Sequence, residues 1–482
     1  MLSESSPKTE IVPCVREIWL GLSILSLVLL APGLSAQTAL SAPTPTQLNS
    51  SSYQGSVPTG EVSEQPIDLT LDDAIQRGLK FNLGAILSTT QASGVRGQRL
   101  SQMQALLPTV DASWKESLQQ VDLAALGLRV PGFPTIVGPF GYTDLRAFLS
   151  WAVVDVNSLR TYLAARHNFN AAQLTAEDAR QMVVLTVGNA YLLVLADESL
   201  VTAAASQVAT SKVSLDQAVN LHQAGTAPLL DELRARVDYQ TLQQLLIVDQ
   251  NALEKDRLAL ARTIGLPLAQ KFNLVDKVPF SPFDQLDIDA TIRQAHANRK
   301  DLAAMVEQTS AAKEQRKAAT ADRYPTIKTD VDYGLIGVNF GTSHGTVDAA
   351  GTVSVPVFKE FGLRGEAEQA QSQLDTQTAE LSDKNAQVDA DVRVALLDIA
   401  SAQQQVEVAR SSVDLANEAL SEAQQRYAAG VSDNLAVHQA EQSVAVANNQ
   451  YVSSLYRHNL AKLSLARSLG AAENYKSYLG GK

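Results

Sequence analysis

Histidine and cysteine are the side chains in this chain that would most readily bind a metal or act in catalysis. The six histidines are scattered along the sequence, at His167, His222, His296, His344, His438 and His458. The sequence contains no His-Glu-x-x-His, Gly-x-Ser-x-Gly, phosphate-loop or paired-cysteine motif. We therefore expect no catalytic residue, no metal site and no cofactor, and we expect His222 to be a packed or pore-facing residue.

The single cysteine, Cys14, lies in an N-terminal segment that is typical of a secretory signal peptide. Basic Lys8 and Arg16 precede an apolar run at 18–30, which is followed by Gly33-Leu34-Ser35-Ala36, where Leu34 is bulkier than the usual residue of a cleavage site. We expect residues 1–36 to be a signal peptide and the Ser-, Thr- and Pro-rich stretch 37–66 to be a disordered leader. The net charge of −12 argues against nucleic acid as a partner.

The rest of the chain contains an internal duplication at an offset of about 205 positions. Ala224-Gly225 aligns with Ala429-Gly430, and residues 261–265 align with 466–470. We therefore divide the chain into a first repeat at 67–265, a linker (equatorial region) at 266–286, a second repeat at 287–470 and a C-terminal tail at 471–482.

Each repeat contains very long helices, because residues 366–429 include no Gly or Pro and residues 159–224 include only Gly188. Apolar residues in the second repeat are spaced alternately four and three apart, which predicts a coiled-coil seam. The seam comprises Val388, Val392, Ala395, Ile399, Ala402, Val406, Ala409, Val413, Ala416, Leu420, Ala423 and Tyr427. The same positions in the first repeat carry three polar exceptions, Asp197, Ser211 and His222. Two helical hairpins are therefore predicted, turning at Gly225 and Gly430.

Two stretches before each long helix alternate with a period of two, which predicts β-strands. The predicted strands cover about 109–118 and 143–154 in the first repeat, and about 326–336 and 346–356 in the second. One apolar and one charged face per strand is typical of an outer-membrane barrel, and a half-buried soluble hairpin is the alternative. No segment after the signal peptide approaches the roughly 20 consecutive apolar residues of a membrane helix, so spanning would fall to the strands.

Four strands cannot close a barrel, and an open sheet edge cannot lie in hydrocarbon. Three copies would supply twelve strands, whereas two would supply eight and a lumen filled by side chains. The predicted fold class is thus an α+β membrane protein. It is expected to be a homotrimer that forms a 12-stranded outer-membrane barrel on an α-helical periplasmic tunnel.

With these lengths and this order, the chain resembles the TolC-like outer membrane efflux family over nearly all of its mature length. The similar motifs are residues 69–75 opening the first helix, Leu107-Pro108 and Tyr324-Pro325 opening strands, and residues 426–430. Val355-Pro356-Val357-Phe358 enters a long helix, which makes Pro356 and Phe358 the barrel-to-helix junction. The resemblance implies a passive export duct that works with a periplasmic adaptor protein and an inner-membrane transporter.

The resemblance also implies gate positions at the periplasmic end. The acidic residue after the first turn is matched by Asp231, and the tyrosine before the second turn by Tyr427. The arginine of the family's latch falls on Ser432, and the two aspartates that ring its aperture fall on Ala436 and Gln439. Charge near the gate would come from Asp231 and Asp433 instead. An ordinary solvated helix end is the alternative for each of these residues.

The two hairpin turns lie farthest from the strands, so we expect them to contact the adaptor. They comprise Gly225, Thr226, Ala227 and Pro228 in the first hairpin and Gly430, Val431, Ser432 and Asp433 in the second. A simple chain reversal is the alternative. For the whole protein, the alternative is a periplasmic or surface coiled-coil structural protein without a pore, which would leave the duplicated strand pairs unexplained. The residues do not separate small-molecule efflux from protein secretion.

Overall fold

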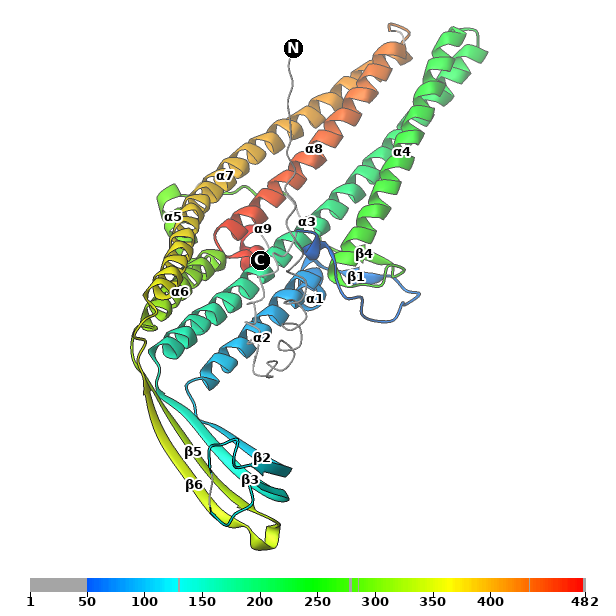
Figure 1. The fold of residues 1–482 in the computed structure, drawn as a ribbon. Coiled ribbons are helices and arrows are strands. Elements are labelled where there is room, and N and C mark those ends of the chain that lie inside the picture. Colours follow the sequence, from blue (N-terminus) through cyan, green and yellow to red (C-terminus); the bar gives the residue numbers. More distant parts are fainter. Residues whose placement is uncertain (1–49, 129–130, 277–279, 285, 433, 480–482) are drawn as a thin grey trace, which may run out of the picture. The chain divides into compact units, whose positions relative to one another are not determined.

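The computed structural model describes residues 50–482 apart from 129–130, 277–279, 285, 433 and 480–482. The predicted signal peptide, the first part of the predicted leader and Asp433 lie outside the described residues. The described part is mostly helical and carries one four-stranded sheet (Figure 1).

The first repeat contains two short helices, two long strands and a long helical hairpin. Its elements are β1 (Ile67–Leu69), α1 (Leu71–Phe81), α2 (Leu83–Gln104), β2 (Thr109–Asp122), β3 (Ile136–Val154), α3 (Val156–Gln223) and α4 (Leu229–Ile264). The short 3-10 helix η1 (Ser50–Gln54) precedes it. Strand β3 begins seven residues before the predicted position 143, because pairing with β2 continues to Ile136 opposite Asp122.

The second repeat follows the same order after the short strand β4 (Phe272–Leu274). Its elements are α5 (Ile288–Asn298), α6 (Lys300–Ala321), β5 (Thr326–Gly337), η2 (Phe340–Thr342), β6 (His344–Ser354), α7 (Glu360–Ala428) and α8 (Asn434–Ser468). The chain ends with η3 (Ala472–Asn474) and α9 (Tyr475–Leu479). Strand β6 lies two residues earlier than predicted, because its last pair joins Ser354 to Thr326.

The seam predicted on α7 is buried from Val388 to Ala409, which confirms the heptad pattern there. Beyond Ala409 the seam residues up to Tyr427 are half-buried. The equivalent seam of α3 is also covered, and its polar exceptions Asp197 and Ser211 are buried as well. At about 1.5 Å per residue, helices of 68 and 69 residues each extend roughly 100 Å.

Each helical hairpin reverses through a glycine with a positive φ. Gly225 has φ +73° and Gly430 has φ +68°, a left-handed conformation that favours glycine at the end of a helix. The second helix of each hairpin, α4 or α8, is also followed by a glycine with a positive φ: Gly265 has φ +75° and Gly470 has φ +67°. Both long helices of each repeat are therefore followed by a glycine in the left-handed conformation, at equivalent positions of the duplicated sequence.

One helix of the described residues, α3, contains an 18-residue window apolar enough to cross a membrane, with a mean hydropathy of 1.4. Its residues Val183, Val187 and Leu192 pack in a core with α1, α4 and α8. We interpret α3 as a core helix, because these residues are buried against other helices of the chain.

The prediction that residues 37–66 form a disordered leader is wrong for the part that the structure describes. The backbone N–H of Val57 donates to the Phe81 carbonyl at 2.9 Å, and that of Thr59 donates to the Gly265 carbonyl at 3.0 Å. The Tyr53 ring packs over Gly84, where a Cβ would overlap it. Composition predicted disorder because this stretch has few large apolar residues, but backbone hydrogen bonds to helix ends fix it.

The linker and the C-terminal tail both pack against elements of the first repeat. Strand β4 pairs in parallel with β1, and Tyr191 on α3 donates to the Leu69 carbonyl at 3.1 Å. At the other end of the chain, the Tyr475 hydroxyl donates to Asp72 at 2.6 Å across 403 positions. Ala472, Tyr475 and Leu479 are buried in the core with Leu69 and Ile75. The tail is therefore a packed element of the first repeat's core.

Candidate functional site: the strand sheet and the hairpin turns

The four long strands form one antiparallel sheet in the order β2-β3-β5-β6. Residues on one face are mainly apolar. They include Val110, Ala112 and Trp114 of β2, Leu145, Ala147 and Leu149 of β3, Val331, Tyr333 and Leu335 of β5, and Val347 and Val353 of β6. Trp114 is 66 % exposed and Val347 is 71 % exposed, so this face has no protein cover in the described chain.

The opposite face of the sheet carries charged residues that pair with one another. The Arg146 guanidinium contacts Asp332 of β5 and lies 3.3 Å from Asp144 of its own strand. Arg146 also donates to the Thr346 hydroxyl at 3.1 Å. The alternating sequence thus produces a sheet with one apolar face and one polar, hydrogen-bonded face.

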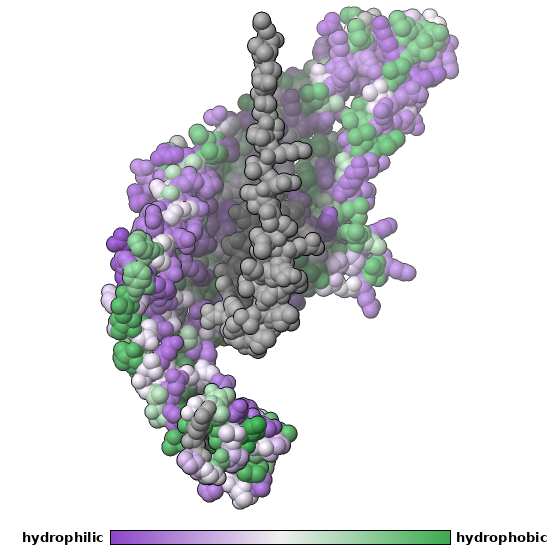
Figure 2. Space-filling view, viewed as in Figure 1, coloured by the Kyte–Doolittle hydropathy of each residue, from purple (hydrophilic) through white to green (hydrophobic). Residues whose placement is uncertain are grey.

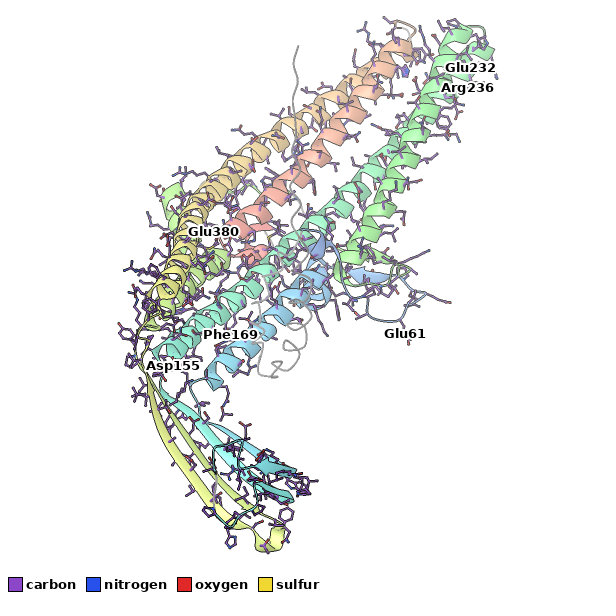
Figure 3. All side chains as sticks on the ribbon, in the orientation of Figure 1. Glu61, Asp155, Phe169, Glu232, Arg236 and Glu380 are labelled. Carbon is purple, nitrogen blue, oxygen red and sulfur yellow. The ribbon has the colours of Figure 1, made fainter. Side chains whose placement is uncertain are left out.

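An exposed apolar segment joins the sheet to the second hairpin. Pro356 and Phe358 lie between the end of β6 and the start of α7, and Val357, Phe358 and Phe361 are each more than 80 % exposed. Figure 2 shows apolar side chains at the surface where the strands pass into the helices. On the first repeat, Asp155 caps the start of α3 by accepting from the Ser158 N–H at 3.0 Å (Figure 3).

The turn of the first hairpin is closed by local hydrogen bonds. The N–H groups of Thr226 and Ala227 donate to the Leu221 carbonyl at 3.0 and 3.2 Å, and Pro228 occupies the position directly before α4 without a side-chain capping bond. Glu232 and Arg236, labelled in Figure 3, form an ion pair of 2.7 Å one turn farther along α4. Gly225, Thr226 and Pro228 are exposed, and Ala227 is half-buried.

The turn of the second hairpin is built in the same way. The Val431 N–H donates to the Arg426 carbonyl at 3.0 Å, and the Gly430 N–H donates to the Tyr427 carbonyl at 3.0 Å. Val431 is 71 % exposed and Ser432 is half-buried. Asp433, predicted both as a gate residue and as a turn residue, lies outside the described residues.

Among the predicted gate residues, Asp231 of the first hairpin lies close enough to Tyr427 of the second for its charge to act on the Tyr427 hydroxyl. Asp231 is buried. Burial of the Tyr427 hydroxyl raises its pKa, and the negative charge of Asp231 raises it further. Within the described residues, the Tyr427 hydroxyl is buried without a hydrogen-bond partner. Ala436 is half-buried and Gln439 is exposed on α8.

Three contacts near the turns connect the second hairpin to the first, and the sequence did not reveal them. His438 Nε2 on α8 contacts Asp238 Oδ2 on α4, and the Asn434 amide donates to the Asp231 carbonyl at 3.4 Å. The Ser214 hydroxyl on α3 donates to Glu441 on α8 at 2.7 Å. The only signal in the sequence was polar residues close to the turn of each hairpin, which a solvated helix end would also carry.

Burial and the nearby Arg234 guanidinium lower the pKa of His438. In its contact with Asp238, the Nε2–H of His438 donates to the carboxylate. Burial also raises the pKa of Glu441, although the Ser214 hydroxyl opposes this. Among the described residues, no group of three or more His, Cys, Asp or Glu side chains is placed to hold a metal ion.

Long helical hairpins on a sheet with one apolar face define the fold of outer-membrane channel proteins, and the comparisons agree. The structure is similar to the CmeC outer membrane channel of Campylobacter jejuni, with a TM-score of 0.76 and 16 % identity over 89 % of this chain and 95 % of that one. It is also similar to the outer membrane protein VceC of Vibrio cholerae, with a TM-score of 0.74 and 17 % identity over 83 % and 96 % of the two chains.

The sequence matches the family model for outer membrane efflux proteins at residues 95–266 and 291–471. The chain belongs to the outer membrane efflux protein family, a family of transport proteins of the outer membrane. A curated relative is the toluene efflux pump outer membrane protein TtgC of Pseudomonas putida, 22 % identical over 84 % of this chain and 83 % of the relative. Another is the probable efflux pump outer membrane protein SepC of Pseudomonas putida, 26 % identical over 64 % of each chain.

Proposed function

We propose that three copies of this chain form a passive export duct, with a 12-stranded barrel in the outer membrane and an α-helical tunnel in the periplasm. The duct is coupled to an inner-membrane transporter through a periplasmic adaptor protein. The observation that carries the proposal is the four-stranded sheet, which has an exposed apolar face and two outer strands that each pair on one side only.

Lipid contact explains the apolar face of the sheet. Within the described chain, β2 pairs only with β3 and β6 pairs only with β5, so each has one unpaired edge. Unpaired backbone groups in hydrocarbon cost several kcal/mol each, so β6 of one copy must pair with β2 of the next. Three copies give twelve strands, enough for a water-filled lumen lined by the face of Arg146 and Asp332.

The helical hairpins supply the periplasmic tunnel, and their turns supply its far end. We place the closed gate where Asp231 of the first hairpin approaches Tyr427 of the second. The turns at 225–228 and 430–433 are the proposed contact with the adaptor, because they lie farthest from the strands along both hairpins. Outward movement of one hairpin from the other would open the tunnel.

The relatives favour small molecules over proteins as cargo. One curated relative is named as the outer membrane protein of an antibiotic efflux pump, and another as the outer membrane protein of a toluene efflux pump. We therefore propose small, largely apolar compounds as the exported class. Export of a protein substrate by a type I secretion system is the alternative.

The assembly is tested by multi-angle light scattering on the detergent-solubilised mature protein. We expect three times the protomer mass, and a stable monomer would refute the shared barrel. Planar bilayers then test the pore itself. Discrete conductance steps support the duct, whereas a trimer without conductance would favour a coiled-coil structural protein.

A strain that lacks the gene tests cargo and direction of transport. We expect this strain to accumulate an apolar dye and to become sensitive to apolar antibiotics, with normal secretion of proteins. Loss of a secreted protein with unchanged dye efflux would instead assign the chain to type I secretion.

A further inference from the structure

A carboxyl group of α3 is buried inside the first helical hairpin without a hydrogen-bond partner for one of its oxygens in the described residues, at a level far from the turn. Asp197 occupies a seam position of α3 between Val194 and Val201 and is 9 % exposed. Its neighbour is Asp256 of α4, which lies within hydrogen-bonding reach of the Asp197 carboxyl. Within the described residues, Asp197 Oδ2 is buried without a hydrogen-bond partner.

The surroundings of this carboxyl pair are apolar or acidic. Val194, Leu253 and Leu260 are buried in the same core, and Tyr456 of α8 packs against it. Asp249, two turns before Asp256 on α4, adds a further negative charge that acts on Asp197. No positive charge contacts the pair in the described contacts.

Arg257, next to Asp256 on α4, is already engaged with two glutamates, and the Tyr456 hydroxyl of α8 donates to another residue. Arg257 donates to Glu198 at 2.8 Å and to Glu254 at 3.0 Å. The Tyr456 hydroxyl donates to Asn189 at 2.6 Å, and its pKa is raised by burial and by the charges of Asp197 and Asp256. Among the described residues, the titratable groups of α3, α4 and α8 therefore supply no counter-ion to the pair.

The second repeat shows that this hairpin geometry does not need the carboxyl groups. At the offset of 205 positions, Asp197, Asp249 and Asp256 correspond to Ala402, Ser454 and Ala461. All three of these are buried. The same helix pairing is thus built once with small residues and once with three acids, so the acids are a specific property of the first hairpin.

We propose that Asp197 and Asp256 form a proton-operated contact that makes the packing of α4 on α3 depend on pH. With one shared proton, the two carboxyls hydrogen bond across the hairpin. When both ionise, two negative charges face each other in an apolar seam and α4 loosens at this level. The inference concerns the first hairpin alone and goes beyond the proposed duct.

The electrostatics agree with this geometry. Burial, followed by the hydrogen bond and charge of Asp256, raises the pKa of Asp197 to about 7. Burial also raises the pKa of Asp249. Because the folded-state pKa of Asp197 exceeds the unfolded value, its contribution to stability is present in acid and is lost as the pH rises through about 7.

Hydrogen exchange of the intact, detergent-solubilised protein tests the proposal, with the second hairpin as an internal control. Amide protection is compared between residues 243–262 of α4 and the equivalent residues 448–467 of α8, at about pH 5.5 and about pH 8.5, after correction for intrinsic exchange. The comparison is made in the His458→Leu variant, because titration of His458 would itself change protection in the control helix. We expect α4 to lose about tenfold more protection than α8, equivalent to about one pKa unit of coupling. Equal changes in the two helices would overturn the proposal.

Three variants separate the carboxyl pair from general effects of charge. Asp197→Ala copies Ala402 of the second repeat, and Asp197→Asn keeps a hydrogen-bonding group without the charge. Both should remove the extra loss of protection in α4, whereas Asp216→Asn, an exposed position on the same helix, should retain it. If Asp197→Asn keeps the wild-type pH dependence, the proposal is wrong, even where Asp197→Ala fails to fold.

Discussion

His438 on α8 contacts Asp238 on α4, which joins the two helical hairpins close to their turns. Asn434 and Ser214 contribute the other two described side-chain contacts between the hairpins in this region. Since the hairpins belong to different repeats, any movement that separates their turns must break these contacts.

We predict that His438→Ala shifts the duct toward its open state. Loss of a hydrogen bond to a charged group costs about 1.5–3 kcal/mol, so the closed state should lose about tenfold or more in relative population. Planar-bilayer recordings should show a larger open fraction. His296→Ala is the matched control, because His296 pairs with Asp389 within the second repeat, and it should behave as the wild type.

We predict that Val406→Asp strongly destabilises the second hairpin. Val406 is 1 % exposed on the α7 seam, so the substitution buries an unpaired charge and should cost about 3–5 kcal/mol. Thermal unfolding followed by circular dichroism measures the loss. Gln404→Asp, two residues away on the exposed face, should change stability little; equal melting temperatures would contradict the buried seam.

We predict that His458 makes the fold less stable in acid. Both ring nitrogens are buried without a partner in the described structure, and the Phe280 ring lies 5.0 Å away. Burial, and then the charge of Lys462, lowers the pKa of His458 to about 4. The unfolded chain binds a proton near pH 6.5, so stability should fall by about 2–3 kcal/mol between about pH 6.5 and 4.

His458→Leu tests this prediction, because the equivalent residue in the first repeat is Leu253. Urea unfolding at several pH values should show that the variant lacks this component of the acid-induced loss. The difference between variant and wild type should be small at pH 8 and should grow toward pH 4. A difference that does not vary with pH would show that the ring titrates normally.

We predict that Gly84→Ala releases the segment before the first repeat. A Cβ at Gly84 would overlap the Tyr53 ring, so the ring must move at a cost of about 1–3 kcal/mol. Limited proteolysis should cut residues 50–66 faster in the variant. Gly94→Ala in the same helix meets open space and should stabilise by up to about 1 kcal/mol without changing the cleavage.

We predict that the combined substitutions Ala227→Glu and Val431→Glu abolish export without affecting folding or assembly. Both positions lie in the exposed turns, where bulky charged side chains would obstruct the adaptor. Dye efflux in cells, with light scattering of the purified trimer, separates the two effects. Thr202→Glu with Gln404→Glu places the same charges on the helix surface; normal export by the turn variant would locate the adaptor on the side of the tunnel.

The sequence by itself determined the helical hairpins, the strands and the family. The 3.5-residue spacing from Val388 to Ala409, the alternation from Ile327 to Leu335 and the glycines at 225 and 430 are local patterns. Backbone geometry turns each of them directly into a helix seam, a strand or a turn. These features recur twice along the chain, so each repeat supports the interpretation of the other.

Only the tertiary structure decided which residues from distant segments meet. The contacts of Tyr475 with Asp72, His438 with Asp238 and Asp197 with Asp256 join different helices, so no local spacing encodes them. The same holds for residues 50–66, whose polar composition predicts disorder, although the N–H groups of Val57 and Thr59 donate to carbonyls at helix ends. A polar side chain in a sequence is consistent with solvent or burial, and the packing of its neighbours decides between them.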